Sequence, residues 1–296
     1  CRDCGLVFKC GDCSVSLTHH RSENALLCHY CGYRTGLPDE CPNCGGRRVT
    51  SRGVGTERVE KELESFFPAV RVARMDLDTT SRKGAHQKIF YSFKKGEADI
   101  LLGTQMVAKG FDFPRVTLVG VISADTALNI PDFRSAERTF QLLTQVAGRT
   151  GRGDLGGEVV VQTYSPDHYA IQLARVHDYL GFYRREIEER RELNYPPFSR
   201  LVRIVMSSPV EEEARKESLR FASKLRDGAG RVDILGPAPA PIPKVRRHHR
   251  WQILIKGKDS SAIQRALQPV LSERRREGVR ITVTVDPVDM LSLIHI

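Results

Sequence analysis

The sequence predicts a mixed α/β fold class with three parts: a zinc-ribbon-like cysteine-rich module, a lobe with a parallel sheet, and a C-terminal α+β domain of βαββαβ order. All eight cysteines lie within the first 44 residues, which indicates a local metal-binding device. Helical and strand patterns then alternate, and a proline pair precedes a second set of strands and helices. The expected domains are residues 1–50, 51–166, a helical linker at 167–197, residues 198–290, and a tail at 291–296, for which a non-native segment and a short added edge strand are the two alternatives.

Composition limits the function classes that fit this chain. Its 296 residues suffice for two or three domains, and 40% hydrophobic with 28% charged residues is typical of a folded globular protein. No apolar run reaches the length of about 18 residues that a membrane-spanning helix needs. The 46 Lys and Arg against 36 Asp and Glu give a net charge of +10. This balance favours a polyanionic partner such as nucleic acid, and a basic surface without a partner is the open alternative.

The cysteines form four C-x-x-C pairs, which begin at Cys1, Cys10, Cys28 and Cys41. Two intervening residues let a tight turn aim both sulfurs at one metal ion, so four pairs predict two Cys₄ zinc sites. Four thiolates close the coordination shell, which makes each site structural rather than hydrolytic. The alternative, a disulfide framework, needs an oxidising compartment. The lack of a signal peptide and of cysteine elsewhere favours zinc and the cytoplasm.

Loop lengths indicate which pairs share an ion. Five residues separate Cys4 from Cys10, too few to fold one pair against the next, whereas fourteen separate Cys13 from Cys28, enough for a small hairpin. The predicted sites are therefore Cys1, Cys4, Cys41 and Cys44 for one zinc ion, and Cys10, Cys13, Cys28 and Cys31 for the other. Because a predicted ligand is the first residue, we expect the chain to be a fragment whose outer site holds zinc more weakly than in a longer chain.

The second domain is expected to alternate helices and strands. Residues 53–67 predict a turn followed by an amphipathic helix, which Pro68 ends. The near-continuous apolar runs at 99–103 and 116–122 are typical of buried parallel strands. The remaining elements are strands at 70–74 and 158–164 and helices at 82–95 and 134–147. This alternation predicts a doubly wound sheet, whose ligands bind at the carboxyl ends of the strands.

Two loops of this domain carry residues that suit nucleotide binding. One, residues 104–116, follows a buried strand. The other closes a helix with the pattern Q-x-x-G-R-x-G-R, formed by Gln145, Gly148, Arg149, Gly151 and Arg152. Its glycines permit close approach of the backbone, and its two arginines can clamp a triphosphate and neutralise charge on a transferring phosphoryl group. A Gly/Arg turn that only caps the helix is an equally weighted alternative.

The C-terminal domain follows a mixed-charge segment, residues 169–193, that predicts one long helix or a helix pair. Strands at 201–206, 232–235, 251–256 and 280–286 and helices at 211–225 and 260–275 predict both helices on one face of an antiparallel sheet. The proline-rich residues 236–250 are expected to form a loop that ends in basic residues beside Trp251. Its candidate phosphate contacts for single-stranded or branched DNA are Lys244, Arg246, Arg247 and Arg250. The alternative is a solvated loop with a core tryptophan.

The two nucleotide-binding loops resemble the second motor lobe of superfamily-two helicases. Motif V falls on Thr104, Gly110 and Asp112, and motif VI on Gln145, Gly148, Arg149 and Arg152. With the cysteine block ahead of them, the strings GTERVEKEL, ADILLGTQMVAKGFDFPRVTLV, DFRSAERTFQLLTQVAGRTGRG and NYPPF resemble the PriA family of bacterial replication-restart helicases. The resemblance implies a RecA-like lobe. It places Gly110, Asp112, Gln145 and Gly148 at ATP with Mg²⁺, Arg149 and Arg152 at the phosphates, and Thr104 near the DNA backbone.

The resemblance also implies a function: an ATP-dependent 3′–5′ DNA helicase at stalled replication forks that restarts replication through primosome assembly, in the bacterial cytoplasm at the nucleoid. Implied partners are forked and single-stranded DNA, single-stranded-DNA-binding protein, primosome proteins and a helicase loader. Arg250 and Gln252 are candidates for binding the tail of single-stranded-DNA-binding protein. The sequence contains no G-x-x-x-x-G-K-[ST] or D-E-x-H motif. We therefore expect half of an ATPase site and no ATP hydrolysis by the chain alone. The alternative is a non-catalytic, zinc-stabilised DNA-binding or primosome-loading module.

Overall fold

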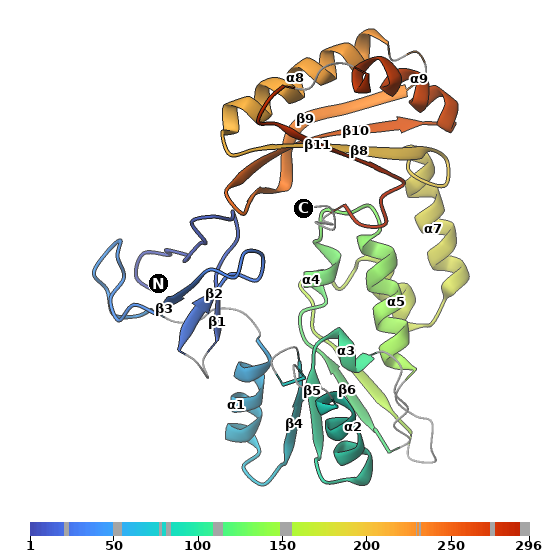
Figure 1. The fold of residues 1–296 in the computed structure, drawn as a ribbon. Coiled ribbons are helices and arrows are strands. Elements are labelled where there is room, and N and C mark those ends of the chain that lie inside the picture. The colour runs from blue at the N-terminus through green and yellow to red at the C-terminus, as the bar shows by residue number, and fades with distance from the viewer. Residues whose placement is uncertain are drawn as a thin grey trace. The chain divides into compact units, whose positions relative to one another are not determined.

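The computed structural model describes residues 1–20, 24–49, 55–76, 79–80, 84–108, 115–148, 156–228, 230, 232–272 and 276–290. The chain forms two compact units, of which one combines Cys1–Ser51 with Ile187–Ile296 and the other is Arg52–Glu186 (Figure 1). The cysteine-rich module and the C-terminal domain therefore belong to one unit although the whole second domain separates them in sequence. No helix in the described part of the chain combines the length and the hydropathy that crossing a bilayer requires.

The cysteine-rich module contains a small antiparallel sheet of strand order β1-β2-β3. Its strands are β1 (Thr18–His20), β2 (Ala25–Leu27) and β3 (Arg34–Gly36). β1 and β2 lie between Cys13 and Cys28 and pair antiparallel, which is the hairpin that this loop length predicts. Ala25 and Leu26 are buried, but three-residue strands cover little apolar surface. A module of this size therefore depends on cross-links for its stability.

The middle unit alternates helices and strands. Its elements in chain order are α1 (Thr56–Phe66), β4 (Val72–Met75), α2 (Ala85–Lys95), β5 (Ile100–Gly103), α3 (Gln105–Ala108), β6 (Leu118–Val121), α4 (Asp125–Leu128), α5 (Ser135–Ala147), β7 (Glu158–Val161) and α6 (Tyr169–Arg175). β4 pairs with β5 and β6 pairs with β7, in both cases parallel. The predicted parallel strands are thus confirmed, and in the described residues they form these two pairs.

The largest apolar cluster of this unit surrounds helix α5. Phe140 of α5 stacks on Phe182, at the start of α7 (Tyr179–Glu192), with ring centroids 4.2 Å apart. Both rings are buried together with residues of α6. α5 also contacts α3, which directly follows β5. This packing fixes the end of α5 that carries Gln145 and Gly148.

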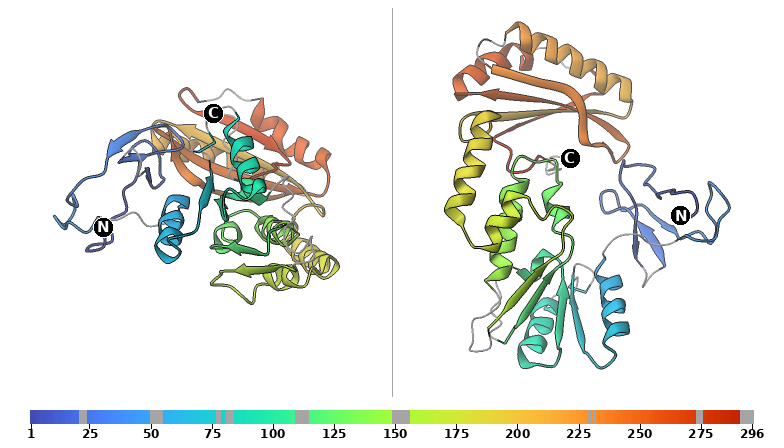
Figure 2. Two further views of the ribbon diagram at one scale, coloured as in Figure 1. Left: turned by 90° about the horizontal axis from the view of Figure 1, so that it is seen from below. Right: turned by 180° about the vertical axis from the view of Figure 1, so that it is seen from behind.

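The C-terminal domain has the predicted βαββαβ order. Its elements are β8 (Arg200–Ser208), α8 (Glu211–Asp227), β9 (Val232–Val245), β10 (His248–Gly257), α9 (Ser260–Leu271) and β11 (Arg280–Val285). The strand order is β11-β8-β10-β9 and every neighbouring pair is antiparallel. Both helices lie on the same face of this sheet (Figure 1, Figure 2). The core between helices and sheet includes Val202, Ile204, Met206, Phe221, Leu225, Ile253 and Ile255.

Residues 236–250 differ from the loop that their proline content predicts. They belong to β9 and β10, which a two-residue turn at Arg246 and Arg247 joins into a long hairpin. β9 is an edge strand, and its pairing with β10 shifts register between His249 and Trp251. An edge strand needs hydrogen bonds on one side only, and a bulge leaves backbone groups unpaired, so both positions tolerate proline. The loop prediction was wrong because the cost of proline depends on the place of the strand in the sheet.

Candidate metal centres and motor motifs

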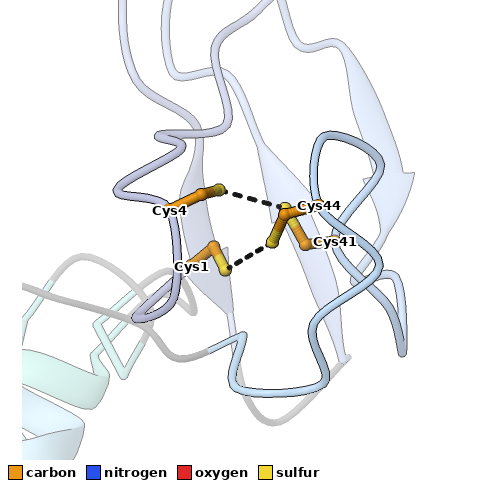
Figure 3. A group of neighbouring side chains, drawn as sticks. All are labelled: Cys1, Cys4, Cys41 and Cys44. Atoms are coloured by element: carbon orange, nitrogen blue, oxygen red, sulfur yellow. Dashed lines mark hydrogen bonds between the residues drawn. The ribbon is translucent and has the colours of Figure 1, made fainter.

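The outer cysteine pairs form one cluster, Cys1, Cys4, Cys41 and Cys44, with all Sγ atoms within 4.8 Å of one another. The Sγ–Sγ distance is 3.7 Å both for Cys1–Cys44 and for Cys4–Cys41 (Figure 3). Four sulfurs about 2.3 Å from a zinc ion lie about 3.8 Å apart in a tetrahedron, whereas disulfide sulfurs lie about 2.05 Å apart. The spacing therefore fits zinc. Cys4 and Cys44 are exposed to solvent.

The inner pairs form the second cluster, Cys10, Cys13, Cys28 and Cys31, again with all Sγ atoms within 4.8 Å of one another. The Cys10 and Cys31 sulfurs are 3.5 Å apart. Unlike the outer cluster, this cluster is largely buried: Cys13 and Cys28 are each 1% exposed. Part of the cover comes from Ile242 and Val245 of β9. The structure thus assembles the two groups of cysteines that the loop lengths predict, and zinc binding by each group is a proposal.

Glycine closes three of the four C-x-x-C turns. Gly5, Gly32 and Gly45 have φ values of 77°, 79° and 69°, a left-handed conformation that favours glycine. Each glycine N–H donates to the carbonyl oxygen of the first cysteine of its pair, at 3.1, 2.9 and 2.8 Å respectively. The fourth pair, at 10 and 13, is followed by Ser14 instead.

Backbone N–H groups also reach the cysteine sulfurs. The Asp3 N–H donates to Cys1 Sγ at 3.3 Å. At Cys28, burial acts to raise the pKa of the thiol, but the hydrogen bonds to its sulfur, led by the N–H groups of Cys31 and Tyr30, together leave that pKa below its usual value. Such bonds stabilise the thiolate, which is the form that binds a metal ion.

The acidity of the thiols varies within each cluster, since each contains one cysteine with a lowered pKa and at least one with a raised pKa. The Asn43 side chain, with the Leu6 N–H, lowers the pKa of the exposed Cys4 to about 7. Burial raises the pKa of Cys13 to about 12. A buried thiol gives up its proton when a strong positive charge takes the proton's place, as a divalent cation does. The donor set therefore fits Zn²⁺ in both clusters, where the ion would be a structural cross-link with no position left for water.

Three of the basic residues expected to bind DNA contact the cysteine-rich module. Lys244 Nζ donates to the Gly11 carbonyl oxygen at 3.0 Å, and Arg246 Nε donates to the Tyr30 carbonyl oxygen at 3.1 Å. Arg247 Nε lies 2.8 Å from Asp12 Oδ1. Arg246 and Arg247 are nevertheless solvent-exposed. DNA binding by these three residues stays a prediction.

The position of Arg250 corrects the prediction that this residue contacts DNA. It is only 6% exposed, and its Nη1 donates to the Ile242 carbonyl oxygen at 3.4 Å. Burial, followed by the nearby charge of Arg203, lowers its pKa. A guanidinium inside the domain does not reach a phosphate, which contradicts the predicted DNA contact at this residue. The prediction failed because basic residues in a presumed loop were taken to face solvent.

The motor motifs are described in part. Thr104 directly follows β5, is exposed, and accepts the Val107 N–H at 3.1 Å. Gln145 and Gly148 are exposed at the end of α5, where the Gly148 N–H donates to the Thr144 carbonyl oxygen at 3.1 Å. Because α3 and α5 are in contact, the two motifs start from neighbouring elements. The other predicted nucleotide and catalytic residues, Gly110, Asp112, Arg149 and Arg152, lie outside the described residues.

One contributor to the inner cluster escaped the reasoning from sequence. The N–H of Arg246 donates to Cys13 Sγ at 3.2 Å across 233 positions of sequence. The available signal was Ser14, which stands where the other three pairs have glycine. That difference shows that one C-x-x-C turn is built in another way, but not which segment completes it.

Three family models match the chain in succession. They are the PriA DNA helicase Cys-rich region domain over residues 10–35, the helicase conserved C-terminal domain over residues 50–154, and the primosomal protein N C-terminal domain over residues 191–288.

Similar curated proteins carry the name "Replication restart protein PriA". The chain is 48% identical to the one from Bacillus subtilis (strain 168), over 98% of this chain and 37% of that protein. It is 44% identical to the one from Synechocystis, over 86% of this chain and 31% of that protein. It is 41% identical to the one from Chlamydia muridarum, over 97% of this chain and 39% of that protein. The chain thus spans less than half the length of these relatives.

Proposed function

Since the chain belongs to the PriA family, we propose that it is the C-terminal portion of an ATP-dependent 3′–5′ DNA helicase. This helicase would act at stalled replication forks and restart replication by primosome assembly. The observation that carries the proposal is the succession of a cysteine-rich module, a helicase C-terminal lobe and a PriA-type C-terminal domain in one chain. Each part contributes a different function.

The middle unit would supply half of the motor. Ligands of parallel α/β sheets bind beyond the carboxyl ends of the strands, where Thr104 follows β5, and α5 contacts the adjacent helix α3. In the proposed site, Gly110, Asp112, Gln145 and Gly148 contact ATP, whose Mg²⁺ is held mostly by another part of the protein. Arg149 and Arg152 neutralise charge on the γ-phosphoryl group when the two motor lobes close, and Thr104 contacts the DNA backbone.

The cysteine-rich module would hold two zinc ions as structural cross-links and present a folded surface to the fork and to primosome proteins. The hairpin residues Lys244, Arg246 and Arg247 would contribute phosphate contacts to branched or single-stranded DNA. The net charge of +10 supports a polyanionic partner. Single-stranded-DNA-binding protein and a helicase loader are proposed as further partners from family membership.

The test uses the full-length protein with Arg149→Ala or Arg152→Ala. Loss of one such arginine is expected to lower DNA-dependent ATP hydrolysis and unwinding by about 10³-fold or more while fork binding persists. The 296-residue chain alone is expected to release no phosphate above the background of its Arg149→Ala variant. Unwinding that survives both substitutions, or ATP hydrolysis by the chain alone, contradicts the proposed division of the motor and favours the module without catalysis.

A further inference from the structure

The turn at Cys10 and Cys13 is completed by a distant part of the chain. In the other three C-x-x-C turns, the N–H that follows the second cysteine donates back to the first cysteine of the same pair. At the corresponding position, the Ser14 N–H donates to the carbonyl oxygen of Lys244, on the free edge of β9, at 2.9 Å. The hairpin therefore supplies the carbonyl acceptor that the first cysteine of the pair supplies in the other three turns.

The sulfur of Cys13 also receives its hydrogen bond from the hairpin, whereas other cysteines receive theirs locally. At Cys4 and Cys44, the second cysteines of the outer pairs, a backbone N–H two residues further along the chain donates to the sulfur, from Leu6 and Gly46. At Cys13 the N–H comes from Arg246, at 3.2 Å. The hairpin thus supplies both an acceptor and a donor that a self-contained C-x-x-C turn supplies internally.

The two residues at the hairpin tip hold both halves of the inner cluster. Arg247 contacts the first pair: its N–H donates to the Asp12 carbonyl oxygen at 2.8 Å, and its Nε lies 2.8 Å from Asp12 Oδ1. Arg246 contacts the second pair, because its Nε donates to the carbonyl oxygen of Tyr30 at 3.1 Å. One tight turn therefore bridges the two pairs that would share an ion.

The identity of the turn residues supports a role beyond turn formation. Arg246 and Arg247 have φ values of 49° and 64°. A two-residue hairpin turn with both φ angles positive favours Asn-Gly, and arginine is disfavoured there. Residues in such conformations persist when the surroundings hold them, as the contacts with Asp12 and Tyr30 do here.

We propose that the tip of the β9–β10 hairpin is a clasp for the inner metal site, which replaces the missing self-closure of the Cys10 and Cys13 turn and thereby determines how long the inner zinc ion is retained. Partners in the second shell of a metal site orient the ligands, and their loss lowers metal affinity by about 10–100-fold. Because β10 is a central strand of the C-terminal sheet, retention of the inner ion then depends on the C-terminal domain.

The experiment follows zinc release from the full chain to an excess of a colorimetric chelator. The inner and outer phases are assigned with Cys44→Ser, which removes the outer site. Arg247→Glu places a carboxylate against Asp12 and should accelerate the inner phase about tenfold while the outer phase is unchanged. Reversal of the pair, Asp12→Arg with Arg247→Glu, should restore slow release. The matched control is Arg215→Glu, which places a carboxylate against Glu212 of α8 in a pair of the same 2.8 Å length, and it should change neither phase.

A second substitution tests the replacement of self-closure directly. Ser14→Gly lets that position adopt the positive φ of the other three turns, so it should slow inner release again in the Arg247→Glu background. Unchanged inner release in Arg247→Glu, equal acceleration of both phases, or no recovery with Ser14→Gly would each overturn the clasp.

The inference rests on the proposed zinc binding and is independent of helicase activity. The two can fail separately. A chain that binds fewer than two zinc ions by metal analysis refutes the zinc proposal. A chain with two zinc ions whose inner release ignores the hairpin refutes the clasp alone.

Discussion

The two cysteine clusters have the same ligands but different support. The outer cluster is closed by turns of its own chain segments, with glycine at positions 5 and 45, and its Cys4 and Cys44 face solvent. The inner cluster is buried, and one of its turns is completed by a hairpin from the C-terminal domain. Identical donor sets can therefore be held by local geometry at one site and by tertiary contacts at the other. The first kind of site forms wherever its segment folds, whereas the second depends on a distant domain.

The largest expected effect is on cleavage of the hairpin tip by trypsin, which should differ between Cys28→Ala at the inner site and Cys41→Ala at the outer site. Each substitution should lower the zinc content of the chain from two ions to one. Loss of a structural zinc ion removes a binding free energy on the order of 10 kcal/mol, and at the inner site that loss also releases the hairpin tip. Trypsin should therefore cleave after Arg246 or Arg247 at least about tenfold faster in Cys28→Ala, whereas Cys41→Ala should cleave at the wild-type rate.

The fragments are identified by mass spectrometry, and cleavage after Arg175, at the end of α6, serves as an internal control in the other unit. Equal acceleration at the hairpin in both cysteine variants would contradict the different support of the two sites.

The second prediction concerns the unmodified chain. A chelator reaches the exposed Cys4 and Cys44 directly, whereas Cys10, Cys13 and Cys28 of the inner site are buried and pack against β9 of the hairpin. In a stopped-flow chelation experiment, the outer zinc ion should therefore be released first, at a rate about tenfold higher than that of the inner ion. Replacement of zinc by ¹¹³Cd and loss of one of the two NMR signals identify the order. Simultaneous loss of both signals would mean that the two sites open together.

Much of this comparison was accessible from sequence, and the rest was not for physical reasons. Loop lengths predicted both cysteine groups because five residues are too few to fold one cysteine pair against the next, whereas fourteen residues are enough for a hairpin between two pairs. Apolar runs predicted the strands of the middle unit. The succession of strand and helix patterns predicted the βαββαβ order of the C-terminal domain. The docking of Arg246 on Cys13 was not predictable, because a contact across 233 positions leaves no local pattern. The burial of Arg250 was missed because the proline content of residues 236–250 predicted a solvent-exposed loop where the structure has an edge strand and its partner.

The third prediction tests whether the clasp works against the local turn preference. Arg246→Asn with Arg247→Gly gives the turn its favoured sequence and removes the two side-chain contacts. The C-terminal domain should become more stable to urea by about 1 kcal/mol or more, because positive-φ strain is relieved, while inner zinc release becomes faster. Urea unfolding and chelation on the same sample measure both. A less stable domain that retains zinc as before would show that the arginines serve the hairpin and not the metal site.

The smallest effect is expected at the outer cluster, where a similar ion pair and the backbone hydrogen bond from the Arg2 N–H to the Arg48 carbonyl oxygen join segments of the cysteine-rich module itself. Arg48 Nε lies 2.6 Å from Asp3 Oδ1, and the Arg48 and Asp3 side chains are 71% and 27% exposed, close to the 79% and 32% of Arg247 and Asp12. Exposed pairs of this kind contribute about 0.2–1 kcal/mol and weaken with salt. Arg48→Ala should therefore accelerate outer zinc release by no more than about fivefold, and the effect should vanish near 0.5 M salt. The corresponding effect of Arg247→Glu on inner release should persist in salt, because it also displaces the N–H of Arg246 from Cys13. If both effects vanish together, the two sites differ only in burial, and the hairpin adds charge but no support to the inner cluster.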